Sequence, residues 1–381
     1  MNFVRRLAEI RRYMEEHDVV ASVVIKPVNQ YYLSGFETIT YSRLILTVID
    51  HSRCSLILPG IEEEWGREIS IADAFFPYFE HPCEASRGTS AIQHLKTLLA
   101  VYQKGSRIGV EMDAAPYGVC LDLIGLGFEP FDVAPKIASM RAIKDPDEIT
   151  RIRRASEFAV IVAAATAKAA KPGLTELEVD SIGTETAKNA VREKYPGSIA
   201  DPGRSMTISG VERTVMPHVL TGTRKLDVGD VVMTTRQFAV DSYCADCQRT
   251  FFVGGRRTKK QQAIYDLVVE SQAAAVEQIK PGVSAKEIEQ ASRKVIDDAG
   301  YGEFFTHRLG KSTGLEAVEE PFIRFDSEYE VRPGMVFNIL PGIYLPGIGG
   351  FRVSDTVLVT ETGHEVLTEG CPKDLDELVA N

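Results

Sequence analysis

Two side chains, His218 and Arg43, are of types that could act on a small molecule. His218 lies in MPHVLTGTRKLDVGD, and histidine is the side chain best suited to proton transfer at neutral pH. Arg43 lies in NQYYLSGFETITYSRLILTV, and a guanidinium can hold a carboxylate through two parallel hydrogen bonds. Cys244 and Cys247 form a CxxC, but no second pair stands at zinc spacing, so we interpret both as ordinary strand cysteines. The sequence contains no glycine-rich phosphate loop, Ser-His-Asp order or GxSxG elbow.

Four stretches in the second half of the chain resemble the signature blocks of the pita-bread superfamily. That superfamily includes methionine aminopeptidase, proline dipeptidase, aminopeptidase P and creatinase. The stretches read GDVVMTTRQFAVDSYCADCQRTFFVG, FTHRLGKSTGLEAVEEPFI, RPGMVFNILPGIYLPGIGG and FRVSDTVLVTETG. In the peptidases of the superfamily, two Asp, one His and two Glu hold two metal ions. The resemblance places those ligand positions, in chain order, on Thr235, Asp246, Lys311, Leu340 and Ser354.

Only Asp246 keeps the ligand type that the resemblance requires. A bridging water is deprotonated near neutral pH where hard carboxylate ligands surround divalent ions. The hydroxyls of Thr235 and Ser354, with the aliphatic Leu340, cannot neutralise two such ions. We therefore predict no metal site and no cofactor, with the Lys311 ammonium paired to Asp246. That pair either takes part in binding and catalysis or simply fills an inactive site.

The resemblance to creatinase, which is metal-free, implies further roles. Creatinase uses the histidine that corresponds to His218 as its catalytic acid and base. Its N-terminal domain extends an aromatic residue and an arginine, here Tyr41 and Arg43, into the neighbouring subunit's pocket, where the arginine holds the substrate carboxylate. The alternatives are a structural or surface histidine and an exposed strand-edge arginine. Creatinase holds its guanidinium substrate with two glutamates that fall here on Gln248 and Leu340, so creatine is not the expected substrate.

The candidate site combines these positions. The superfamily has an arginine close to the site at the place of Arg352. His218, Lys311 and Asp246 are the predicted catalytic residues. The predicted substrate-binding residues are Arg43, Tyr41, Arg352, Thr235, Ser354 and Gln248.

The elements that position these residues follow from hydrophobic pattern and caps. In the first third, buried strands such as VVASVVIKP and SRIGVEM alternate with helices, which predicts a mixed sheet flanked by helices. A helix start at Asp145-Pro146-Asp147-Glu148 marks a boundary, which gives domains 1–143 and 144–381. KPGLTELEV (171–179) recurs as KPGVSAKEI (280–288), and each copy opens a helix through a capping box. This repeat fits the two related halves of the pita-bread fold.

Composition excludes several classes of function. At 381 residues, two domains are the natural expectation. The formal net charge of -11 argues against nucleic-acid binding, which depends on clustered Lys and Arg. No apolar run of about 18 residues or signal-peptide region occurs, so we expect no membrane association. Six scattered cysteines do not form a disulfide framework, and we expect a cytoplasmic protein.

We expect a two-domain α/β protein with an N-terminal creatinase-like mixed α/β domain and a C-terminal pita-bread domain, α+β and pseudo-twofold. It should form a homodimer whose N-terminal domain contributes to the partner's pocket. The main functional prediction is a metal-independent, creatinase-like hydrolase of an amide, urea or lactam C–N bond in a small carboxylated compound. The alternatives are an inactive pseudo-peptidase that binds a peptide or protein, and a metal-dependent Xaa-Pro peptidase. An enzyme should keep a polar cavity, whereas a binding module should have it filled by Leu340 and Val318.

Overall fold

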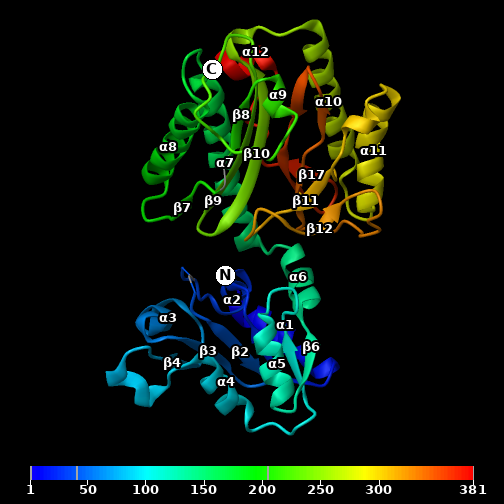
Figure 1. Ribbon diagram of the computed structural model, residues 1–381. Coiled ribbons are helices and arrows are strands. Elements are labelled where there is room, and N and C mark those ends of the chain that lie inside the picture. The colour runs from blue at the N-terminus through cyan, green and yellow to red at the C-terminus, as the bar shows by residue number, and fades with distance from the viewer. Residues whose placement is uncertain (1, 40–41, 204–205, 381) are drawn as a thin grey trace. The chain divides into compact units, whose positions relative to one another are not determined.

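The structure, a computed structural model, describes residues 2–39, 42–203 and 206–380 (Figure 1). Its backbone divides into two compact units, Met1–Arg141 and Ala142–Asn381. We call them the first unit and the second unit and describe each by itself. Among the described residues, every helix is too short or too polar to cross a membrane.

The first unit is built on a six-stranded mixed sheet with the order β4-β3-β2-β1-β5-β6, as the alternating pattern predicted. Strand β1 pairs antiparallel with β2 and parallel with β5. Its apolar sequence VVASVV is buried on both faces, as expected for a central strand. The elements are α1 (Phe3–Glu16), β1 (Val19–Val24), α2 (Pro27–Ser34), β2 (Leu46–Asp50), β3 (Cys54–Pro59), η1 (Gly60–Glu62), α3 (Glu63–Ile69), β4 (Ala74–Tyr78), η2 (Pro82–Arg87), α4 (Ala91–Leu99), β5 (Arg107–Val110), α5 (Tyr117–Gly125), β6 (Glu129–Asp132) and α6 (Ala134–Ala142).

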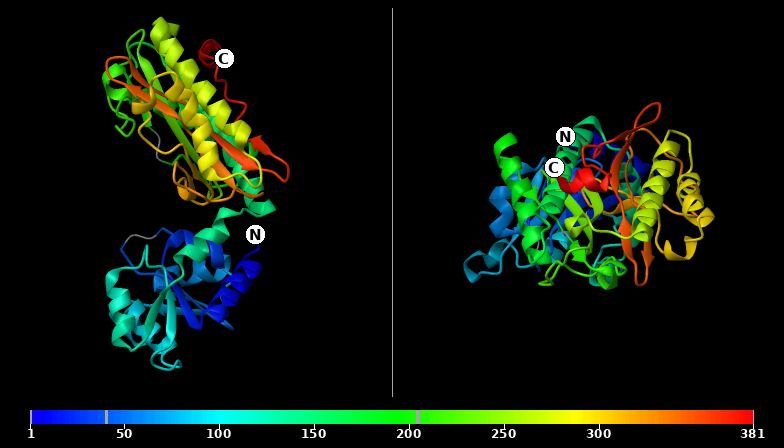
Figure 2. Two further views of the ribbon diagram at one scale, coloured as in Figure 1. Left: turned by 90° about the vertical axis from the view of Figure 1, so that its right-hand side faces the viewer. Right: turned by 90° about the horizontal axis from the view of Figure 1, so that it is seen from above.

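The second unit places long helices beside antiparallel sheets. One sheet has the order β10-β9-β7 with β8 also paired to β9, a second has the order β12-β11-β13-β16-β17, and β14 pairs with β15. Helices α10 and α11 pack side by side (Figure 2). The elements are α7 (Pro146–Ala169), α8 (Glu176–Lys194), β7 (Ala200–Asp201), β8 (Met206–Ser209), α9 (Val211–Thr214), β9 (Val231–Val240), β10 (Tyr243–Phe252), η3 (Val253–Gly255), α10 (Lys259–Gln278), α11 (Ala285–Asp298), η4 (Gly302–Phe304), β11 (Gly310–Ser312), β12 (Glu319–Ile323), β13 (Val336–Ile339), β14 (Gly342–Leu345), β15 (Gly349–Arg352), β16 (Asp355–Val359), β17 (His364–Val366) and α12 (Leu375–Ala380).

The helix starts that the sequence predicts are confirmed. Asp145 caps α7 in a capping box with Glu148, and Pro146 takes the first helical position. The boxes that open α8 and α11 are also present, with Thr175 and Ser284 as their N-caps. Each box satisfies two backbone groups that a helix terminus otherwise leaves without partners.

The sequence repeat corresponds to a repeat in the backbone. The N–H of Gly173 donates to the carbonyl of Leu226 at 2.8 Å, and the N–H of Gly282 donates to the carbonyl of Val331 at 2.9 Å. The two N-caps likewise form matching antiparallel bridges, Thr175 with Lys225 and Ser284 with Glu330. Equivalent hydrogen bonds at equivalent places show that the second unit consists of two related halves. The pseudo-twofold pita-bread architecture is confirmed.

A buried ion pair joins β10 to β16. Arg249 Nη2 lies 2.8 Å from Asp355 Oδ1, and both side chains are fully buried. The other guanidinium nitrogens donate to backbone carbonyls, including those of Ser354 and Pro372. Lys373 Nζ lies 2.8 Å from the second carboxylate oxygen of Asp355. Burial raises the pKa of the Asp355 carboxyl, but Arg249 and Lys373 more than offset it and hold the pKa at about 2.

We expect Asp355→Asn to lower the free energy of unfolding by about 3–5 kcal/mol, because it leaves the buried Arg249 charge without its partner. Urea denaturation at pH 7 measures this loss. The native pKa of Asp355 is depressed, so its stabilising contribution is present above the unfolded value near 4 and is lost as pH falls toward 2.

The matched control is Asp298→Asn, which removes one partner of the exposed pair between Lys294 and Asp298. It should cost less than about 1 kcal/mol. An Asp355→Asn variant as stable as this control would contradict the structural role that we assign to the ion pair.

Candidate functional site

The second unit contains a cavity of about 940 Å³. Its walls come from β9, β10, β11, β15 and α11, together with the loops that join them. Polar and charged lining residues are His218, Thr235, Gln237, Gln248, Glu289, Arg293, Thr306, His307, Arg308, Lys311, Arg324 and Arg352. The apolar ones are Met206, Pro217, Phe305, Val318, Phe325 and Leu340. Leu340 and Val318 line the cavity without filling it.

Arg352 forms part of the buried floor of this cavity. Only 4% of the residue is exposed, and its Nη2 donates to Thr235 Oγ1 at 2.5 Å. Its Nη1 lies 3.5 Å from the Tyr344 hydroxyl, and its Nε has no partner among the described residues. Neither partner carries a negative charge. A buried guanidinium that meets only hydroxyls favours the binding of an anion.

Lys311 and Asp246, which the sequence predicts as a pair, lie beside each other. Lys311 Nζ is 3.4 Å from Asp246 Oδ2, and the two side chains are 8% and 1% exposed. Gln248 Nε2 donates to the same oxygen at 2.9 Å. Asp246 Oδ1 has no partner within the part of the chain that the structure describes. Asp246 therefore neutralises Lys311 from behind, while Lys311 and Gln248 face the cavity.

These residues do not fit a pair of divalent metal ions. Among the described residues, no group of three or more His, Cys, Asp or Glu side chains is placed to hold a metal. The Thr235 hydroxyl accepts from Arg352, and the buried Ser354 hydroxyl has no partner in the described ranges. The carboxylate of Asp246 is already paired with the Lys311 ammonium. One carboxylate beside an ammonium cannot balance the charge of two divalent cations.

Two histidines line the cavity. His218 is exposed and lies in the segment between α9 and β9. His307 lies closer to the interior, with Nδ1 at 2.8 Å from the Arg308 carbonyl and Nε2 at 2.9 Å from the Tyr344 hydroxyl. Burial lowers the pKa of His307 to about 4, so the ring is neutral at pH 7. A carbonyl only accepts, so Nδ1 carries the proton and Nε2 accepts from Tyr344.

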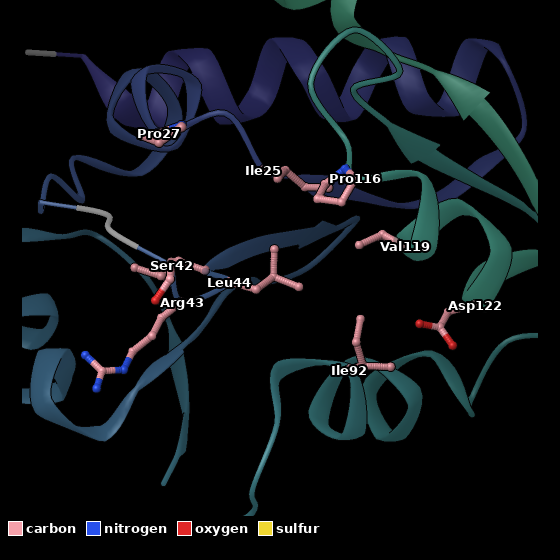
Figure 3. Close-up of a pocket in the computed structure, with 11 residues that line it drawn as sticks. Ile25, Pro27, Ser42, Arg43, Leu44, Ile92, Pro116, Val119 and Asp122 are labelled. Atoms are coloured by element: carbon pink, nitrogen blue, oxygen red, sulfur yellow. The ribbon is translucent and has the colours of Figure 1, made fainter. Parts of the chain in front are cut away.

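Arg43 lies in the first unit, beside a different cavity of about 470 Å³. Its guanidinium donates to Glu80 from Nε at 2.9 Å and from Nη2 at 2.8 Å, and 46% of the side chain is exposed. Figure 3 shows this side chain extending away from Leu44, Val119 and Ile92, which form the apolar wall of that cavity. Tyr41 lies outside the described residues. The substrate-binding roles of Arg43 and Tyr41 stay predictions.

The structure gathers most of the predicted site residues of the second unit at one place. Lys311, His218, Arg352, Thr235 and Gln248 line the cavity, and Asp246 supports it from behind. Ser354 lies next to Gln248 through two backbone hydrogen bonds of 3.0 and 3.1 Å.

Four charged lining residues were not predicted from the sequence, namely Glu289, Arg293, Arg308 and Arg324. Arg308 and Arg324 flank β11 and β12, whose pairing brings them to the cavity. Their positions just outside two short strands were the available signal. No comparable signal exists for the two residues on α11.

Comparison with known proteins extends over both units. The model of metallopeptidase family M24 matches residues 150–361, and that of the creatinase/prolidase N-terminal domain matches residues 6–143. The Xaa-Pro dipeptidases of Pyrococcus furiosus and Pyrococcus horikoshii are each 31% identical to this chain, over 96% of it and 97% of each relative. The crystal structure of the prolidase from Pyrococcus horikoshii has a TM-score of 0.85 at 30% identity and covers 97% of this chain and 99% of that chain. A prolidase from Thermococcus sibiricus has a TM-score of 0.87 at 26% identity, with coverage of 98% and 99%.

These comparisons correct the main functional prediction. We expected a metal-independent, creatinase-like hydrolase of a small carboxylated compound, but the matching relatives are named Xaa-Pro dipeptidases and the matching family is one of metallopeptidases. The prediction was wrong because it gave five ligand positions and one short N-terminal stretch more weight than the likeness of the whole chain. The findings agree with the Xaa-Pro peptidase alternative. The membership in the pita-bread superfamily is confirmed, whereas the narrower creatinase-like assignment is not supported.

We expect Lys311→Met to lower the free energy of unfolding by about 3–5 kcal/mol, because it leaves the buried Asp246 carboxylate without its cation. The double variant Lys311→Met/Asp246→Asn should recover part of this loss, since it removes both charges. Denaturant titration of the two variants and the single Asp246→Asn variant completes a double-mutant cycle. Lys294→Met, in an exposed pair, is the control and should cost less than about 1 kcal/mol. Additive effects in the cycle would show that the two buried charges do not interact.

Proposed function

The chain belongs to metallopeptidase family M24, and from this premise we propose that it takes dipeptides of the Xaa-Pro class as its ligands. The family places the chain among the hydrolases that act on peptide C–N bonds. Relatives that match nearly its whole length are named Xaa-Pro dipeptidases, and this name supplies the class of ligand.

The observation that carries the proposal is the unpaired Arg352 guanidinium on the cavity floor. It is 4% exposed, its side chain bonds only to hydroxyls, and its buried Nε has no partner among the described residues. A dipeptide ends in a carboxylate, which accepts two parallel hydrogen bonds from a guanidinium. The carboxylate of the ligand would supply the negative charge that the described residues around Arg352 do not.

The remaining walls suit the rest of such a ligand. Phe305, Leu340 and Met206 offer apolar surface for a proline ring, which has no N–H to satisfy. Lys311 has three N–H donors, of which Asp246 takes one. A second Lys311 N–H can donate to the peptide carbonyl oxygen of the ligand. These contacts account for recognition of the ligand. They do not include the hydrolytic step, for which the family uses metal and which is measured separately.

We expect Arg352→Met to weaken the binding of Ala-Pro, measured by isothermal titration calorimetry, by about 10- to 100-fold. The loss of charge-assisted hydrogen bonds costs about 1.5–3 kcal/mol, and each 1.4 kcal/mol changes the affinity tenfold. The affinity of Arg352→Lys for Ala-Pro should lie between those of Arg352→Met and the natural protein, because lysine keeps the charge but not the bidentate hydrogen-bond geometry.

The control is Arg332→Met, which removes an exposed arginine outside the cavity and should leave the affinity unchanged. Ala-Pro amide, which has no terminal carboxylate, should bind weakly to the natural protein. It should bind to Arg352→Met with the same weak affinity. Failure of Ala-Pro to bind to the folded natural protein would refute the proposal. Release of free proline, followed with and without added Mn²⁺, shows separately whether the bound dipeptide is cleaved and whether cleavage depends on the cation.

A further inference from the structure

The outer part of the same cavity carries a second guanidinium without an anionic partner. Arg293 lies 2.5 Å from Glu289, and the Arg324 side chain is paired with Asp326. Arg308, by contrast, has no carboxylate within ion-pair distance among residues 2–39, 42–203 and 206–380. The cavity therefore offers two unpaired guanidiniums, Arg352 on the buried floor and Arg308 on the exposed rim.

The Arg308 guanidinium is held in place by its neighbours. Its central carbon lies 3.9 Å from the centroid of the Phe322 ring. Phe322 belongs to β12 and lies opposite Lys311 of β11, a strand that begins two residues after Arg308. Stacking against a ring uses one face of the guanidinium plane and leaves its N–H edge for hydrogen bonds. The side chain is thus oriented before any ligand arrives.

The positive charge of the neighbouring Arg324 adds to the attraction that Arg308 exerts on an anion. Partial burial and the neighbouring Arg324 guanidinium lower the pKa of Arg308, so Arg324 is close enough to repel it. Asp326 pairs with Arg324 and, among the described residues, forms no ion pair with Arg308. An anion at the Arg308 edge would relieve this repulsion and gain charge-assisted hydrogen bonds.

We propose that the rim selects dipeptides whose N-terminal residue has an acidic side chain, with Arg308 as the residue that sets this specificity. The inference rests on the proposed function. A dipeptide whose carboxylate meets Arg352 on the floor directs its N-terminal residue toward the exposed rim, where Arg308 and Arg324 lie. A glutamate side chain there would place a carboxylate at the free edge of Arg308.

The cavity also carries one negative charge, which favours the terminal ammonium of such a ligand. Glu289 is the one carboxylate among the described lining residues, and it is 1% exposed. One of its oxygens accepts from Arg293, whereas Oε2 has no partner among the described residues. The negative charge of Glu289 offsets part of the repulsion between the cationic rim and the terminal ammonium, which Glu-Pro, Gln-Pro and Ala-Pro share, so the preference depends on the charge of the side chain.

The test compares Glu-Pro, Gln-Pro and Ala-Pro as ligands of the full chain, by calorimetry or, where the dipeptides are cleaved, by kcat/KM. Gln-Pro has nearly the shape of Glu-Pro without its side-chain charge. We expect Glu-Pro to be favoured over Gln-Pro by about tenfold, as one charge-assisted contact predicts. The ratio should fall toward one in 0.5 M NaCl, because the rim is exposed to salt.

In Arg308→Gln the preference for Glu-Pro should disappear, while the affinity for Ala-Pro stays within about twofold of the natural value. Arg332→Gln, which removes an exposed arginine outside the cavity, should retain the preference. Equal binding of Glu-Pro and Gln-Pro to the natural protein would overturn the inference, as would a preference that survives Arg308→Gln. In either case binding of Ala-Pro leaves the proposed function standing, whereas failure of all three dipeptides to bind overturns both.

Discussion

The buried ion pair between Arg249 and Asp355 is the constraint on which the geometry of the second unit depends. A guanidinium without water around it is tolerated only where its charge and its N–H groups all meet partners. Here those partners come from β10, from Ser354 and Asp355 at the start of β16, and from the segment before α12. Consecutive residues of a strand point to opposite faces, so fixing Arg249 toward the interior fixes Gln248 toward the cavity. The backbone of Ser354, next to Asp355, completes the connection by bonding to Gln248. The floor of the cavity is therefore built from the neighbours of the ion pair.

The charge of the cavity distinguishes this chain from what the superfamily's metal ligands would give. Four carboxylates and a histidine would make a strongly anionic pocket that attracts divalent cations. Here the described lining residues include one carboxylate, Glu289, and five cationic side chains, which are Arg293, Arg308, Lys311, Arg324 and Arg352. Such a cavity attracts anions although the formal net charge of the chain is -11. The family fold and the local electrostatics are thus separate properties of the molecule.

The sequence was sufficient for features set by local rules and insufficient for features set by strand pairing. The capping boxes at Asp145, Thr175 and Ser284 follow from residues three positions apart, and all three are present. The neighbourhood of Lys311 and Asp246 followed from the family blocks. The stacking of Arg308 on Phe322 could not be predicted, because it requires the register of β11 with β12 and the irregularity within that pairing. The likeness to dipeptidases extends over 96% of the chain, whereas the metal-free prediction rested on five ligand positions.

The partners of Arg249 and Asp355 have a consequence for synthesis on the ribosome. Arg249 donates to the carbonyls of Cys371 and Pro372, and Lys373 completes the environment of Asp355. These residues follow the last strand of the second unit, so they emerge from the ribosome after the strands whose ion pair they complete. The first unit, whose strands end at Asp132, can fold while translation continues. The second unit can complete this ion-pair environment only after residues 371–373 have emerged, later than all of its strands.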